Sequence, residues 1–156
     1  MFRLRPDGSA GVLGVVDDLW DGPGLGLEAV GFSPVTGDER LIVLNERKGR
    51  WLPSIWDAAT RATTELEIDL PGDVVASWYV DGNAVLIGHE HHARTELYRY
   101  DLAASELSRL ETPPGTVAGA SARPDGVVEF LWSSGAEPSV VRDTGAVIDA
   151  VLRAMV

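Results

Sequence analysis

Short apolar runs, separated by residues that favour turns, recur along this chain and predict β-strands. The first set of runs predicts strands at residues 27–32, 40–45, 53–57 and 63–68. In the last of them Leu66 and Ile68 alternate with acidic residues, which is the two-residue period of a half-exposed strand. The second set predicts strands at residues 74–79, 84–89, 96–101 and 106–111. Each set therefore predicts one four-stranded antiparallel sheet.

The two sets repeat one another at an offset of about 44 residues, a spacing within the range of propeller repeats. LIVLNERKGR at 41–50 aligns with VLIGHEHHAR at 85–94, and Asp81-Gly82 returns as Asp125-Gly126. A third copy starts at Thr116 and continues through 127–132 and 138–143. Four short strands at this period are typical of a β-propeller blade, and one blade cannot bury both of its faces alone.

The repeats predict one partial β-propeller domain over residues 1–156. It is divided into a half blade (1–22) and three blades (23–70, 71–113 and 114–156). In the last blade the apolar spacing of 147–156 suits a short helix slightly better than a strand. Closed propellers have about four to eight blades. We therefore expect these three and a half blades to be part of a longer protein or to be completed by oligomerisation.

The amino-acid composition argues against two classes of partner, nucleic acids and membranes. The net charge is −11, and Lys48 is the single lysine among thirteen basic residues, so we expect no nucleic acid partner. The chain has no cysteine, no N-terminal apolar signal segment and no apolar run of the ~18 residues that a membrane span needs. We accordingly expect a cytoplasmic protein with no membrane partner and no cofactor.

Three segments resemble a known family: DGPGLGLEAVGFSP at 21–34, LPGDVVA at 70–76 and HEH at 89–91. Residues 3–143 resemble the N-terminal propeller of actinobacterial-type serine peptidases of the prolyl oligopeptidase family (S9), near the acylaminoacyl-peptidase branch. Blade repeats of this kind are also typical of TolB and WD40 propellers.

The resemblance implies a propeller that caps an α/β-hydrolase domain and restricts the access of large peptides to a Ser-Asp-His triad. The triad would lie in that hydrolase domain. This sequence contains no G-x-S-x-G motif, so no catalytic residue is assigned to it.

His89 and His91 are candidate binding residues, because positions i and i+2 of a strand project to one face and imidazole binds zinc, copper or nickel. The preceding blade has Asn45 and Arg47 at the equivalent positions. This favours a polar hairpin end over a metal site, and we expect no metal.

Arg50 and Arg94 are the other candidate binding residues. Glu46 with Arg50, and Glu90 with Arg94, flank the turn between the second and third strands, where opposite charges can pair across the hairpin. We expect these salt bridges. In the alternative, either arginine faces the central channel or a substrate carboxylate.

Two residue types recur in all three blades. We interpret the aspartates that close the third strands as turn residues: Asp57, Asp101 and Asp143. We expect the tryptophans on or beside strands to pack between blades: Trp51, Trp56, Trp78 and Trp132.

These observations favour a noncatalytic propeller that gates substrate access for a hydrolase domain absent from this chain; whether the parent protein is an enzyme stays open. The alternative is a protein-interaction or ligand-binding module that closes its ring as a homo-oligomer. A fragment without a role of its own is a third alternative. The expected partners are an α/β-hydrolase domain or a second propeller half, and a peptide.

Overall fold

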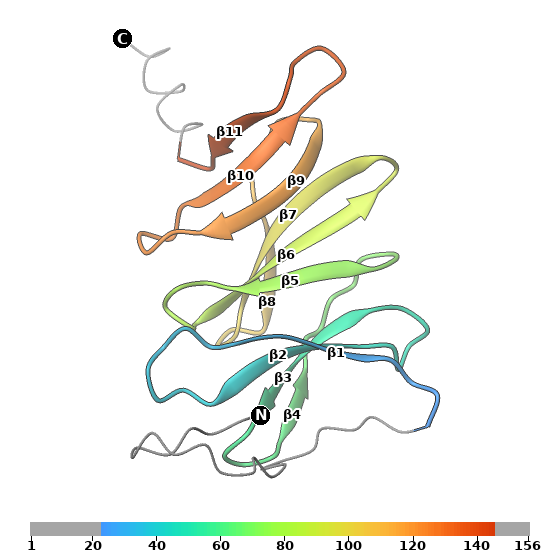
Figure 1. Cartoon of the computed structure of the whole chain (residues 1–156), viewed down its shortest axis with the longest axis vertical. Helices are drawn as coiled ribbons and strands as arrows, with labels where there is room; N and C mark the ends of the chain where they lie inside the picture. Colours follow the sequence, from blue (N-terminus) through green and yellow to red (C-terminus); the bar gives the residue numbers. More distant parts are fainter. Residues whose placement is uncertain (1–22, 146–156) are drawn as a thin grey trace, which may run out of the picture.

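The computed structural model describes residues 23–145, which form three antiparallel sheets that we call blades A, B and C (Figure 1). Blade A contains β1 (Leu27–Phe32), β2 (Arg40–Asn45), β3 (Leu52–Asp57) and β4 (Thr63–Glu65). Blade B contains β5 (Val74–Trp78), β6 (Ala84–His91), β7 (Arg94–Asp101) and β8 (Glu106–Arg109). The described part of blade C contains β9 (Thr116–Ala122), β10 (Val128–Ser133) and β11 (Val140–Asp143).

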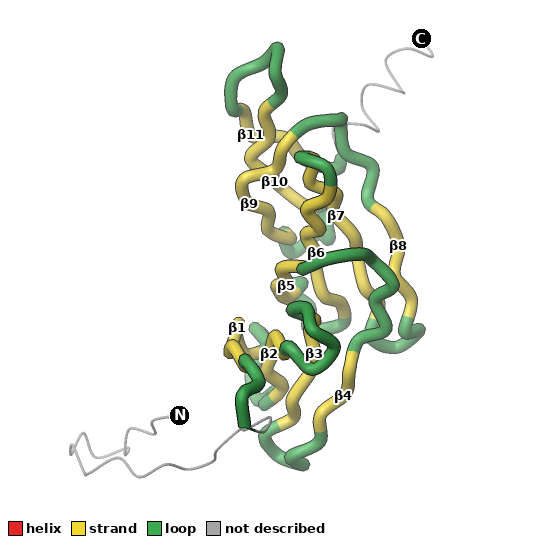
Figure 2. The backbone as a smooth tube through the Cα atoms, turned by 90° about the vertical axis from the view of Figure 1, so that its right-hand side faces the viewer, coloured by secondary structure: helices red, strands yellow, loops and turns green. Residues whose placement is uncertain are grey.

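Consecutive strands pair within each blade, so β1, β5 and β9 each lie at one edge of their sheet. The three blades follow one another along the long axis of the molecule (Figure 1). Strands β1, β5 and β9 lie on one side, which we call the inner edge, and β4 and β8 lie on the other (Figure 2). This is the arrangement of propeller blades. The prediction of an all-β partial propeller is confirmed, and the described sheets do not close into a ring.

The core consists of apolar layers between successive blades. Between blades A and B the layer contains Ile42, Ile55, Leu66, Ile68, Val74, Val85, Ile87 and Tyr100. Between blades B and C it contains Tyr79, Ala84, Leu86, Leu97, Val117, Val128, Phe130 and Trp132. A third cluster, of Leu41, Val43 and Trp56, belongs to the opposite face of blade A. Each blade is thus stabilised by its neighbour, as the repeats predict.

Residues 84–87 of strand β6 form a continuous apolar run, and the structure explains why. Val85 and Ile87 pack against blade A, whereas Ala84 and Leu86 pack toward blade C. All four side chains are at most 3% exposed. A strand that is buried on both faces needs apolar residues at every position.

The repeated Asp-Gly pairs form equivalent turns in blades B and C. Gly82 and Gly126 have φ values of +68° and +84°, which glycine adopts without a steric penalty. The carboxylates of Asp81 and Asp125 accept hydrogen bonds from the backbone two residues on, at 3.0 and 3.1 Å. The turn signal read from the sequence is therefore confirmed in both blades.

The predicted strand at 63–68 is wrong in length, because β4 ends at Glu65. Beyond it the chain leaves blade A for blade B. Leu66 and Ile68 are nevertheless buried, at 5% and 6% exposure, and the backbone NH of Glu67 donates to the Tyr100 hydroxyl at 3.3 Å. The alternating pattern therefore marks a connection packed between two blades rather than a ladder strand.

The strands predicted at 84–89 and 96–101 are each two residues too short at the hairpin. The ladder continues to the pair His91–Arg94, and His92 and Ala93 form the turn with φ values of +49° and +57°. Two successive positive φ values define a type I′ turn, which glycine or asparagine usually provides. Neither residue gives that signal.

Other boundaries differ from the prediction by one or two residues: the structure has Leu52–Asp57, Val74–Trp78, Glu106–Arg109, Val128–Ser133 and Val140–Asp143. The half blade at 1–22 and the helix or strand at 147–156 lie outside the described residues. Among residues 23–145 there is no helix of the length and apolarity that crossing a membrane requires.

Candidate functional site

A groove of about 740 Å³ opens along the inner edge of the three blades. Its walls include residues of the first strand of each blade, namely Glu28 of β1, residues 74–77 of β5 and residues 117–120 of β9, and residues of β2, β6 and β7 complete them. The groove therefore exists only where the blades stack, because no single sheet provides all of its walls. Val75 projects from its middle wall and is 66% exposed.

The charged residues that line the groove all carry the same sign. They are Glu28, Asp73 and Glu90, and no lysine, arginine or histidine is found among its described lining residues. The remaining lining residues are small or apolar, apart from Trp51, Ser77 and Thr95. The groove therefore combines apolar walls with negative charge.

Trp51 is held at the groove by close packing. Its backbone NH donates to the Asp73 carboxylate at 2.8 Å, which joins the start of β3 to the segment before β5. A Cβ at Gly26 would lie 2.6 Å from the Trp51 ring and 2.9 Å from a Glu46 carboxylate oxygen. Glycine at position 26 lets the chain pass this close to the indole ring.

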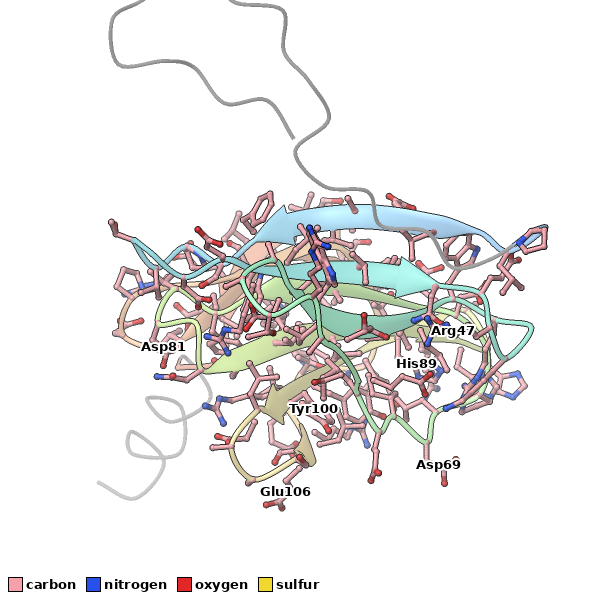
Figure 3. The ribbon with its side chains drawn as sticks, turned by 90° about the horizontal axis from the view of Figure 1, so that it is seen from below. Arg47, Asp69, Asp81, His89, Tyr100 and Glu106 are labelled. Atoms are coloured by element: carbon pink, nitrogen blue, oxygen red, sulfur yellow. The ribbon has the colours of Figure 1, made fainter. Side chains whose placement is uncertain are left out.

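His89 and His91 lie on the same side of β6, as predicted, with stacked rings whose centroids are 5.6 Å apart. His89 is 2% exposed, and its Nε2 donates to the Pro71 carbonyl at 2.7 Å. Figure 3 places His89 at the same end of the blades as Arg47, opposite Asp81. Within the described range no group of three or more metal-ligating side chains forms. We interpret His89 as a structural link between β6 and the connection before β5.

The carboxylate of Glu96 lies beside His89 and joins β7 to β8. It accepts a hydrogen bond from the Tyr98 hydroxyl at 2.7 Å and pairs with Arg109 at 2.8 Å. The Tyr98 hydrogen bond, followed by the charge of Arg109, lowers the pKa of the Glu96 carboxyl. The Nδ1 atom of His89 lies 4.0 Å from this carboxylate and has no hydrogen-bond partner.

The predicted hairpin salt bridges are wrong. In residues 23–145 neither Glu46 with Arg50 nor Glu90 with Arg94 forms an ion pair. Arg50 instead donates to backbone carbonyls of the connection between blades A and B, those of Ile68 and Gly72, both at 3.3 Å.

The cations that do pair at the β2–β3 turn are Arg47 and Lys48. Both contact Glu65 of β4, at 3.5 and 2.9 Å. Charge at this turn is therefore satisfied between strands of the same blade.

None of the four predicted binding residues lines the groove. His89 stacks on His91, and His91 pairs with Arg94 across the β6–β7 ladder. Arg50 and His89 both donate to carbonyls of the connection before β5, those of Gly72 and Pro71.

The per-blade aspartates act as turn residues in two blades. Asp57 accepts from the backbone NH groups of residues 59 and 60, and Asp101 from those of residues 103 and 104, at 2.9–3.0 Å. Trp132 packs between blades B and C, as predicted, at 3% exposure. Trp56 is also buried, at 7% exposure, but on the face of blade A that is turned away from blade B. Trp51 differs, because it borders the groove.

Sequence reasoning missed the groove residues Glu28, Asp73, Glu90 and Trp51. Glu28, Asp73 and Glu90 lie within the three segments that resemble the peptidase propeller, but nothing in those segments marks them as binding residues. The signal that could have found them is positional: the first strands of successive blades share the inner edge of a propeller, so side chains on and beside those strands meet there.

The three stacked meanders define this chain as part of a β-propeller. No protein-family model matches it, and no curated protein matches it. Solved structures do. A puromycin hydrolase matches with a TM-score of 0.67 and 22% identity, over 91% of this chain and 22% of its own.

Two TolB structures also match. TolB from Acinetobacter baumannii gives a TM-score of 0.59 with 21% identity, over 72% of this chain and 28% of its own. A protein described as a TolB from Agrobacterium tumefaciens matches with a TM-score of 0.58 and 16% identity. This match covers 72% of this chain and 40% of the TolB chain. The chain thus spans well under half of each neighbour. At these identities the likeness confirms the fold that the family resemblance predicted, a partial propeller.

Proposed function

We propose that this chain is a noncatalytic portion of the propeller of a prolyl oligopeptidase-type peptidase, where it controls and orients the passage of peptides toward a hydrolase domain. The observation that carries the proposal is the match to puromycin hydrolase, because it extends over 91% of this chain. Residues 23–145 consist of propeller sheets, and the catalytic chemistry would come from elsewhere in the parent protein.

The position of the groove supports this role. In a closed propeller the blades surround a central channel, and the innermost strands line it. The lining of the groove includes residues of β1, β5 and β9, the strands at the inner edge, which would be innermost if the ring were closed. A peptide passing along the channel would therefore contact the groove.

The proposal is tested by a chimera in which residues 23–145 replace the matching segment of puromycin hydrolase. A folded chimera should hydrolyse a small substrate and spare folded proteins, whereas a variant with the segment deleted should lose that selectivity. A folded chimera that degrades proteins as readily as the deletion variant would contradict gating. Labelling of the isolated 156-residue chain by a fluorophosphonate probe would contradict the noncatalytic role directly.

A second candidate function is a self-standing binding module that closes its ring with another copy. One observation favours it: on the face of blade C that does not contact blade B, Leu131 and Val141 pair across β10 and β11 and are 40% and 73% exposed. Paired apolar residues on an open sheet face are suited to packing against a further sheet. The mass of the chain in solution separates the two candidates.

A further inference from the structure

We propose that the inner-edge groove binds an extended peptide segment that carries positive charge, through apolar contacts with β5 and ionic contacts with Glu28, Asp73 and Glu90. This inference rests on the proposed function and deepens it, because it names the chemical class of peptide that the propeller accepts.

The walls of the groove fit alternate side chains of an extended peptide. Leu44, Val75, Leu97 and Val117 line it from three blades, and small residues between them leave room for a backbone. Val75 keeps two thirds of its surface exposed although it lies in a strand within the sheet stack. Covering such apolar surface with a ligand side chain is favourable.

Strand β5 offers a backbone partner as well. It pairs with β6 alone, so one side of β5 has no neighbouring strand in the described sheet. An extended peptide can add to such an edge through main-chain hydrogen bonds, while pockets select alternate side chains. This favours an extended peptide over a compact small molecule.

The charge of the groove determines the charge of the peptide that it binds. The described lining residues carry three carboxylates and no cation, and the chain as a whole has a net charge of −11. The carboxylates are solvent-exposed, and Asp73 is fixed by its bond to the Trp51 backbone. Like-charge repulsion would disfavour acidic peptides, whereas arginine, lysine or a free amino terminus would be attracted. The aromatic face of Trp51 adds a surface on which a cation can stack.

The test is calorimetric titration of the 156-residue chain with three capped pentapeptides: Val-Arg-Val-Arg-Val, its glutamate counterpart and its serine counterpart. We expect the arginine peptide to bind roughly tenfold or more tightly than the glutamate peptide, with the serine peptide between them. Its affinity should fall as salt rises, because the carboxylates are exposed to screening. Equal affinity for all three peptides, or no binding of any, would overturn the proposal.

Isosteric variants locate the site. Glu28→Gln, Asp73→Asn and Glu90→Gln should each weaken the arginine peptide by about two- to fivefold, the range expected of exposed ion pairs. Asn at position 73 can still accept from Trp51. Glu106→Gln is the matched control, since it removes the same charge from β8 on the side away from β1 (Figure 3). If Glu106→Gln weakens binding as much as the three groove variants, the attraction is long-range and the groove is not the site.

The backbone contribution has its own probe. The same arginine peptide with alternate backbone nitrogens methylated cannot pair with β5, and we expect it to bind more weakly. Unchanged affinity would contradict an extended peptide on this edge. These outcomes are independent of the proposed function. If the chimera gates normally but the chain does not bind charged peptides, only the proposed peptide class is refuted. If the chain binds the arginine peptide but the chimera does not gate, the peptidase role is refuted.

Discussion

Substituting Gly115 tests how the connection between β8 and β9 packs against Trp132, whose ring belongs to the layer between blades B and C. A Cβ at position 115 would lie 2.3 Å from the Trp132 Nε1 atom and 2.4 Å from the Ser133 carbonyl oxygen. The Trp132 ring is 3% exposed, and its Nε1 donates to the Pro113 carbonyl at 3.2 Å. Neither the ring nor the backbone can yield without breaking packed contacts, so Gly115→Ala should displace the connection between β8 and β9.

The expected loss is about 2–3 kcal/mol in the free energy of unfolding. Overpacking of this kind costs about 1–3 kcal/mol, and the hydrogen bond of Trp132 contributes about 1 kcal/mol. The lower chain entropy of alanine in the unfolded state offsets about 0.4–1 kcal/mol of that.

Urea unfolding followed by circular dichroism measures this loss as a lower midpoint at an unchanged slope. Gly119→Ala is the matched control in β9, because a Cβ there meets no atom within 4 Å. It should leave stability unchanged or raise it by up to about 1 kcal/mol. If Gly115→Ala unfolds within about 0.5 kcal/mol of the parent chain, the connection before β9 does not pack on Trp132 and Ser133 as described.

Three further changes have defined outcomes. The hydrogen bonds from Arg40 hold the pKa of the Asp38 carboxyl well below its usual range, so this carboxylate stabilises the fold above about pH 4 and loses that effect as pH falls toward its folded pKa. Asp38→Asn should therefore cost about 1–2 kcal/mol at neutral pH in urea unfolding, and a difference that persists undiminished in acid would contradict the linkage. His89→Ala removes a buried ring and its hydrogen bond and should cost about 1–3 kcal/mol, while His91→Ala, at an exposed position, should cost at most about 0.5 kcal/mol; equal effects would refute the structural role of His89. Val141→Asp, on the open face of blade C, should change stability by less than about 0.5 kcal/mol and reduce self-association measured by light scattering, and a strongly destabilised variant would show that this face is covered.

The architecture could be predicted from the sequence because short apolar runs and turn residues recur at the period of the blades. Residues 27–32 and 40–45 are strands with the predicted bounds, and the Asp-Gly pairs at 81 and 125 form equivalent turns. The hairpin through His92 was not predicted, because its positive φ values are adopted by residues that carry no turn signal.

The candidate site was much less predictable. The sequence indicated charged residues at hairpin ends as candidates. It predicted that Arg50 and Arg94 form salt bridges with glutamates of the same hairpin. In the structure Arg50 bonds to carbonyls more than fifteen residues away, at Ile68 and Gly72, contacts that only the stacking of blade A on blade B creates. The groove has the same origin, since Glu28 of blade A and Glu90 of blade B line a common space only when these two blades stack.

The mass of the chain in solution, measured by size-exclusion chromatography with light scattering over a wide range of concentrations, distinguishes a portion of a larger propeller from a self-closing module. The described blades do not close a ring, and we propose that they are a portion of a larger peptidase propeller. We therefore expect the mass of one chain at low concentration, with gradual and non-stoichiometric association at high concentration. A single species of twice that mass, unchanged on dilution, would contradict the account and establish instead a self-closing module.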